Sequence, residues 1–128
     1  MSRIYESGEN YLETILILKS KGVDVRSIDI VHEMELSKPS VSRAMGILRN
    51  DGFIKVDADG YISLTSSGSE VAERIYERHR VLTEWLVDIG VSPQTASEDA
   101  CKIEHDISSE SFTKLKQHLK KEHNKKID

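Results

Sequence analysis

The chain has 128 residues, of which 38% are hydrophobic and 31% charged, and its formal net charge is −4. This composition excludes an intrinsically disordered or membrane-embedded chain, and the length allows one or two small units with a hydrophobic core. The longest strongly apolar run, Ile15–Leu18, is far too short to cross a bilayer. The single cysteine forms no disulfide within the chain, so we expect a cytoplasmic protein.

The acidic balance does not by itself indicate a nucleic-acid-binding protein. Residues 1–65 carry 8 basic and 10 acidic side chains, and residues 66–128 carry 10 and 12. Affinity for DNA would have to come from a local cationic surface, and a ligand that neutralises carboxylates would support it.

Apolar residues at helical spacing predict three helices before residue 51. The first covers residues 4–20, and a short second helix, 28–34, follows with Ser27 as its cap. After a three-residue turn, Ser37 is suited to cap a third helix, with Pro39 in its first turn. Two short helices joined by a tight turn make a helix-turn-helix.

The third helix, residues 37–50, is the segment best suited to DNA. Val41, Met45 and Leu48 share one face, and the segment has three basic residues and no acidic one. A helix with such a polar, cationic outer face fits the major groove. The predicted DNA-binding residues are Ser37, Lys38, Pro39, Ser40, Ser42 and Arg43.

A β-hairpin is predicted directly after this helix. Apolar residues alternate with polar ones at 54–56 and 62–64, and Asp59-Gly60 between them is a turn signal. A hairpin in this place is a wing, and because two aspartates lie at its tip we expect it to brace the unit. Residues 1–66 are therefore predicted to be a winged helix-turn-helix DNA-binding domain.

From residue 67 the apolar pattern is helical again. Ser67 and Glu70 are suited to a capping box at the start of a long helix that ends at Gly90. A shorter helix to about residue 105 and a last helix capped by Ser108 follow, and the tail after Lys120 is expected to fray. Residues 67–128 are thus a second, all-α domain, and the fold class is mainly α.

The apolar stripe of this second domain is wider than a small bundle needs. Palindromic DNA sites are bound by two-fold symmetric proteins, so we predict that this domain forms a homodimer. The alternative is that the stripe packs only within the chain.

One group of polar residues has the chemistry of a metal site. Cys101, Glu104 and His105 have the spacing i, i+3, i+4, which places them on one face of a single predicted helix. His79 interrupts the apolar stripe of the long helix, and Asn10 and Glu13 lie at i, i+3 on the first helix. Thiolate, imidazole and carboxylate suit a divalent transition metal better than calcium or magnesium. The candidate ligands are Asn10, Glu13, His79, Cys101, Glu104 and His105.

Several short motifs occur in a fixed order along the chain. They are Asn10-Tyr11-Leu12-Glu13, Ser37-x-Pro39-Ser40-Val41-Ser42, Asp51-Gly52, Leu64-Thr65-x-x-Gly68, Arg78-His79-Arg80 and Glu98-Asp99-Ala100-Cys101-x-x-Glu104-His105. From about residue 5 to 120 the chain resembles the diphtheria toxin repressor and manganese transport regulator family. The resemblance implies a homodimeric transcriptional repressor of metal homeostasis genes, which binds palindromic operator DNA when loaded with Fe(II) or Mn(II). Zn, Co, Ni or Cd would substitute in vitro, and the six candidate ligands would hold the metal.

The chain also departs from the family pattern. Cys101 matches the iron-type members and Glu13 the manganese-type ones, whereas Asn10 stands where the former have methionine and the latter aspartate. Thr83 and Ser97 replace ligands of a second site in iron-type members. The sequence therefore leaves open which metal is used, whether there are one or two sites, and whether Asn10 ligates through its side chain, its backbone or not at all.

Two other functions are consistent with parts of the sequence. One is a winged-helix regulator that is not gated by metal, with Cys101 as a redox switch or as a buried inert thiol. The other is a small zinc hydrolase with Glu104 as general base, but neither pocket-forming loops nor oxyanion donors are evident. We therefore expect no enzymatic activity, no organic small-molecule substrate and no membrane partner.

Overall fold

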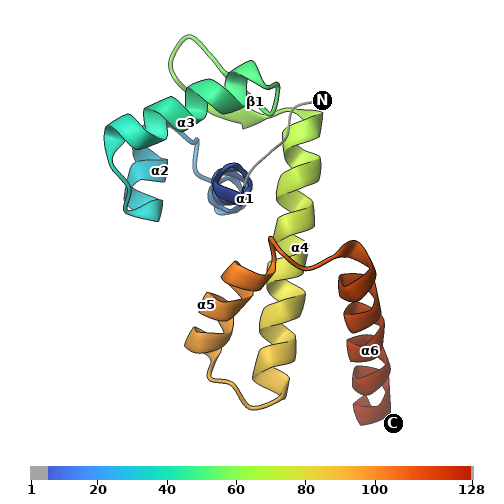
Figure 1. The fold of residues 1–128 in the computed structure, drawn as a ribbon. Helices are drawn as coiled ribbons and strands as arrows, with labels where there is room; N and C mark the ends of the chain where they lie inside the picture. The colour runs from blue at the N-terminus through green and yellow to red at the C-terminus, as the bar shows by residue number, and fades with distance from the viewer. Residues whose placement is uncertain (1–5, 128) are drawn as a thin grey trace. The chain divides into compact units, whose positions relative to one another are not determined.

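The computed structural model describes residues 6–127, with side chains through residue 123. The described elements follow in the order α1 (Glu6–Ser20), α2 (Ser27–Met34), α3 (Lys38–Asn50), β1 (Ile54–Val56), β2 (Ile62–Leu64), α4 (Ser66–Asp88), α5 (Pro93–Ile103) and α6 (Ser109–Ile127) (Figure 1). The chain divides into two compact units, Met1–Arg74 and Ile75–Asp128. The predicted fold class, mainly α with a two-stranded wing, is confirmed, and residues 4 and 5 of the predicted first helix lie outside the described residues.

The first unit has one hydrophobic core, to which α1, α2, α3, the hairpin and the first turns of α4 contribute. Val41, Met45 and Leu48 of α3 are buried in it, as their spacing predicted. β1 and β2 pair antiparallel with Ile54 opposite Leu64, which confirms the hairpin. The core therefore fixes the inner face of α3 and leaves its outer face exposed.

The ends of α2 and α3 show how the helix-turn-helix is built. The Ser37 hydroxyl accepts a hydrogen bond from the Ser40 N–H at 3.3 Å, which confirms Ser37 as the cap of α3. The predicted cap of α2 is wrong, because Ser27 is already helical. Arg26 is the N-cap instead, and its N–H donates to the Asp29 carboxylate at 2.8 Å. The side chain of Asp29, in the first turn, therefore caps this end of the helix.

The acidic tip of the wing has a structural use. One carboxylate oxygen of Asp57 accepts hydrogen bonds from the N–H groups of Asp59 and Tyr61, each at 2.9 Å. Gly60 has a φ of 87°, a left-handed conformation that glycine adopts without strain. The Asp57 carboxylate therefore stabilises the turn of the hairpin.

The start of α4 differs from the predicted capping box. The Thr65 hydroxyl accepts a hydrogen bond from the Gly68 N–H at 3.2 Å and donates one to the Gly52 carbonyl at 2.6 Å, while Ser67 lies inside the helix. A Cβ on Gly68 would lie 2.0 Å from the carbonyl oxygen of Phe53. The glycine therefore allows α4 to pass close to the backbone before β1.

The second unit contains the rest of α4 together with α5 and α6. Gly90, with a φ of 106°, ends the α4 segment as predicted, and the Val91 N–H donates to the Leu86 carbonyl at 2.9 Å. Ser108 caps α6, accepting from the Ser111 N–H at 3.0 Å. α6 is helical to Ile127, beyond Lys120, after which the sequence predicted fraying. Within this part of the chain, no helix has both the length and the apolarity that a membrane crossing requires.

Candidate metal centre and nucleic-acid interface

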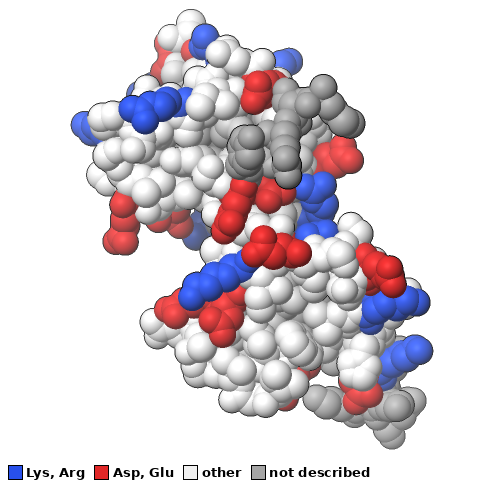
Figure 2. Space-filling model, viewed as in Figure 1, with Lys and Arg blue, Asp and Glu red and all other residues white. Residues whose placement is uncertain are grey.

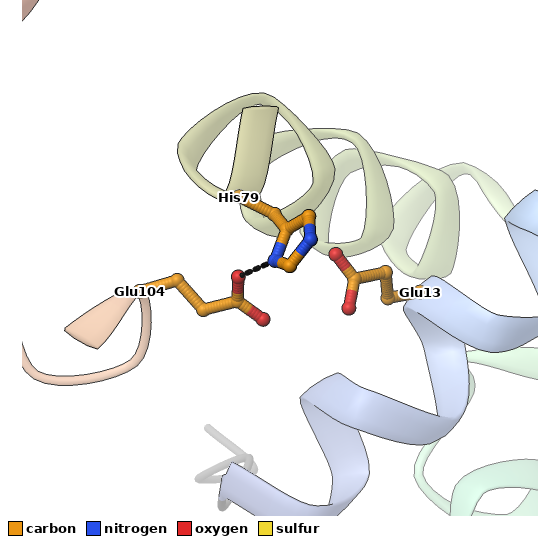
Figure 3. Close-up of side chains that lie close together, drawn as sticks. All are labelled: Glu13, His79 and Glu104. Carbon is orange, nitrogen blue, oxygen red and sulfur yellow. Dashed lines mark hydrogen bonds and ion pairs between the residues drawn. The ribbon is translucent and has the colours of Figure 1, made fainter. Parts of the chain in front are cut away.

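The second unit brings His79, Glu104 and His105 together. Glu104 is 0% exposed; its Oε2 lies 2.8 Å from His79 Nδ1 and its Oε1 lies 3.4 Å from His105 Nε2. Figure 3 shows the contact between His79 and Glu104 as a dashed line. A buried carboxylate is costly unless it is well compensated. His79 contacts Oε2 at hydrogen-bond distance, whereas Oε1 is buried without a hydrogen-bond partner among the described residues. Imidazole and carboxylate together are a suitable donor set for Mn(II), Fe(II) or Zn(II).

The prediction that Cys101, Glu104 and His105 share one face of a single helix is wrong, because only Cys101 lies inside α5. The helix α5 ends at Ile103, Glu104 is its C-cap, and His105 lies in the turn that follows. In the turn, the N–H groups of Asp106 and Ile107 both donate to the Ile103 carbonyl, at 3.0 Å each. The turn, rather than a helix, therefore positions Glu104 and His105 beside α4.

Arg78 holds this turn in place, a role that the sequence analysis missed. Its Nη1 donates to the backbone carbonyls of Glu104 at 3.1 Å and Ile107 at 2.8 Å. Its Nη2 donates to the Ser109 hydroxyl at 3.4 Å, and the guanidinium carbon lies 5.5 Å from the centre of the Phe112 ring. Its spacing could have indicated this burial, because Arg78 lies three residues after Ile75 and four before Leu82, both buried on the same face of α4.

Ser97 and Thr83, which differ from the iron-type pattern, contact His79, and Cys101 lines the same pocket as His79. The Ser97 Oγ is 3.3 Å from His79 Nε2, and the Thr83 hydroxyl donates to the His79 carbonyl at 2.7 Å. Cys101 is exposed. It lines a surface pocket with His79, Ser97, Glu98 and Lys102. The second unit thus places the thiol and the imidazole at the same depression.

The other two candidate ligands belong to the first unit. Asn10 and Glu13 lie on α1, where Glu13 is buried and Asn10 is half-buried; Figure 3 also draws Glu13 on this helix. The backbone carbonyl of Asn10 accepts a hydrogen bond from the Thr14 hydroxyl at 2.9 Å.

A second group of titratable residues connects α6 to α4. His123 Nε2 lies 2.9 Å from a Glu84 carboxylate oxygen and 3.4 Å from one of Asp88. Exposed ion pairs of this kind contribute about 0–1 kcal/mol each. The sequence analysis did not single them out, although the i, i+4 spacing of the two carboxylates was visible.

The predicted DNA-binding residues are all exposed. They lie at the start of α3 and on the loop before it: Ser37, Lys38, Pro39, Ser40, Ser42 and Arg43. Figure 2 shows basic side chains on the surface over this helix. The outer face of α3 is thus a cationic surface on a chain that is acidic overall.

A winged helix-turn-helix followed by an all-helical unit with a buried imidazole and carboxylate cluster defines a class of metal-responsive DNA-binding regulators. Residues 3–62 match the family model described as iron dependent repressor, N-terminal DNA binding domain. Residues 65–126 match the model of the iron dependent repressor metal binding and dimerisation domain. The chain belongs to the iron-dependent repressor family.

Individual relatives agree with this assignment. An HTH-type transcriptional regulator of Methanocaldococcus jannaschii is 30% identical over 91% of this chain and 94% of its own length. The diphtheria toxin repressor of Corynebacterium diphtheriae is 31% identical over 94% of this chain but 54% of its own. The transcriptional regulator MntR of Salmonella typhimurium is 31% identical over 81% and 66%. The chain thus spans almost all of the first relative and about half to two thirds of the others.

Solved structures share the fold. The IdeR structure from T. acidophilum has a TM-score of 0.75 and 25% identity, covering 93% of this chain and 55% of that one. ScaR with bound Zn²⁺ also has a TM-score of 0.75 and 25% identity, covering 88% and 53%.

Proposed function

We propose that this chain is a transcriptional repressor of metal homeostasis genes that binds palindromic operator DNA as a homodimer when loaded with Fe(II) or Mn(II). One observation carries the proposal. Glu104 is fully buried beside His79 and His105 in the unit that matches a metal-binding domain, and the same chain has an exposed cationic recognition helix.

The proposed ligands are the six residues that the sequence singled out: Asn10, Glu13, His79, Cys101, Glu104 and His105. A divalent ion supplies positive charge that offsets their carboxylates. Glu104 is already oriented by its contact with His79, and Arg78 fixes the backbone of the turn from which Glu104 and His105 project. Less rearrangement is then needed when a ligand binds.

The proposed ligands come from both units of the chain. Asn10 and Glu13 belong to α1, which packs beneath the helix-turn-helix, and the others belong to the second unit. Ligation by both groups would favour arrangements of the units that allow it, which is how a ligand shifts a conformational population. We propose that one such arrangement presents α3 to DNA.

The proposed dimer interface lies on the second unit. Val87 at the end of α4 is 38% exposed, and Ile89 directly after it is 63% exposed. The stripe residues Ile75, Leu82 and Leu86 are buried within the chain, so these two side chains near the end of α4 are the apolar groups left for a partner to cover. A two-fold dimer would present two copies of α3, in which Arg43 contacts base edges while Ser37 and Lys38 contact phosphates.

The proposal is tested by the affinity for duplexes selected from a random pool, measured by fluorescence anisotropy. Mn(II), anaerobic Fe(II), Mg(II) and a chelator are compared at several salt concentrations. We expect dimers that bind tightly only with Mn(II) or Fe(II), and an affinity that falls steeply with salt. If the affinity for DNA did not depend on metal but changed when Cys101 was oxidised, the redox alternative would be favoured and the proposal contradicted.

A further inference from the structure

The outer face of α3 carries one large apolar side chain. Ile47 is 55% exposed, whereas the apolar residues of the inner face, Val41, Met45 and Leu48, are buried. Ile47 lies four residues after Arg43, which places both on the same side of the helix. The core of the unit therefore does not account for an isoleucine at this position.

The residue before it is equally unexplained by the fold. Gly46 lies inside α3 and is exposed, and a Cβ added to it would meet nothing within 4 Å. Glycine inside a helix lowers stability relative to alanine, and this backbone does not require it. A missing side chain beside Ile47 does, however, let another surface approach the helix closely.

We propose that Ile47 reads the C5-methyl group of a thymine in the major groove, and that Gly46 provides room for the approach. The inference rests on the proposed DNA-binding function. In the major groove, thymine is the base that presents a methyl group, and apolar side chains recognise it. The three basic residues of 37–50, with no acidic one among them, favour DNA over an apolar protein surface as the occupant.

The test uses a duplex selected in vitro with the Mn(II)-loaded full chain. Each thymine of the half-site is replaced in turn by uracil, which removes the methyl group and keeps the base pairing. At one position per half-site we expect the wild type to lose about fourfold in affinity, the value for one buried methyl group. The variant Ile47→Ala should bind the thymine and uracil duplexes equally at that position, while Ile47→Val should retain part of the difference.

Two further variants on the same helix complete the test, the first of them a control. Arg49→Ala removes an exposed cation and should weaken binding to all duplexes alike, with the uracil effect unchanged. Gly46→Ala should raise the thermal stability of the free protein and lower its affinity for every duplex.

The outcomes separate the inference from the proposed function. If Ile47→Ala and wild type respond identically to uracil at every position, Ile47 does not read a methyl group, although the protein binds DNA. If Ile47→Ala changes the oligomeric state in solution and leaves the uracil response intact, Ile47 is a contact with a second copy and the inference is overturned. A wild type that binds no duplex with any metal refutes the proposed function itself.

Discussion

Replacing Glu104 by Gln keeps the shape of the side chain and removes its charge at the centre of the proposed metal site. Glu104 is 0% exposed, and its carboxylate oxygens face His79 at 2.8 Å and His105 at 3.4 Å. Without metal, two effects oppose each other. The loss of a charge-assisted hydrogen bond costs about 1.5–3 kcal/mol, but a buried charge no longer has to be compensated. We therefore expect the free energy of unfolding without metal to change by no more than about 1 kcal/mol.

With metal the difference is large. An ion at 100 times its dissociation constant stabilises the folded wild type by about 2.7 kcal/mol. If the loss of the anionic ligand weakens binding about 100-fold, the same concentration stabilises Glu104→Gln by only about 0.4 kcal/mol. For a chain of 128 residues, between the two size classes, 1 kcal/mol corresponds to a shift in Tm of about 3–5 °C. The stabilisation by Mn(II) should thus be smaller in the variant by about 7–12 °C.

The assay is calorimetric or fluorimetric thermal unfolding with and without Mn(II). Glu110→Gln is the matched control, because Glu110 is an exposed carboxylate in the first turn of α6 and is not among the proposed ligands. It should keep the full shift in Tm. If Glu104→Gln were stabilised by Mn(II) as much as the wild type, the assignment of the buried carboxylate as a ligand would be refuted.

Four further changes test other parts of the account. Gly68→Ala, whose Cβ would lie 2.0 Å from a backbone carbonyl, should destabilise the first unit by about 1–3 kcal/mol in urea unfolding, whereas Gly46→Ala should not. Glu13→Gln should reduce the coupling between metal and operator affinity by about 1–3 kcal/mol, measured by calorimetry and anisotropy; unchanged activation would leave Glu13 without that role. Asn10→Asp should raise the response to Mn(II) relative to Fe(II), and an identical metal ranking would remove Asn10 from the selectivity. Arg43→Ala should cost about 1–3 kcal/mol on its preferred base pair alone, and an equal loss on all sequences would contradict base reading.

Local patterns were sufficient for most of the elements. The helices and the hairpin follow from the spacing of apolar residues, because one face of each must reach the core. Caps were less predictable, since several residues near a helix start have side chains that can serve. Asp29 and Thr65 act at ends where Ser27 and Ser67 were expected. The choice depends on where the preceding backbone turns, which the tertiary contacts decide.

The sequence by itself determined the amphipathic α3, the acidic turn of the wing and the donor chemistry of the metal site. It could not determine how the donors meet within the second unit, because His79 and Glu104 are 25 residues apart. The end of α5 at Ile103 turns Glu104 and His105 toward α4, and Arg78 secures that turn from inside the core. Such a turn has no apolar periodicity, and two of its carbonyls are bound by a side chain far away in the sequence. Only the packed structure therefore revealed the buried carboxylate between two imidazoles.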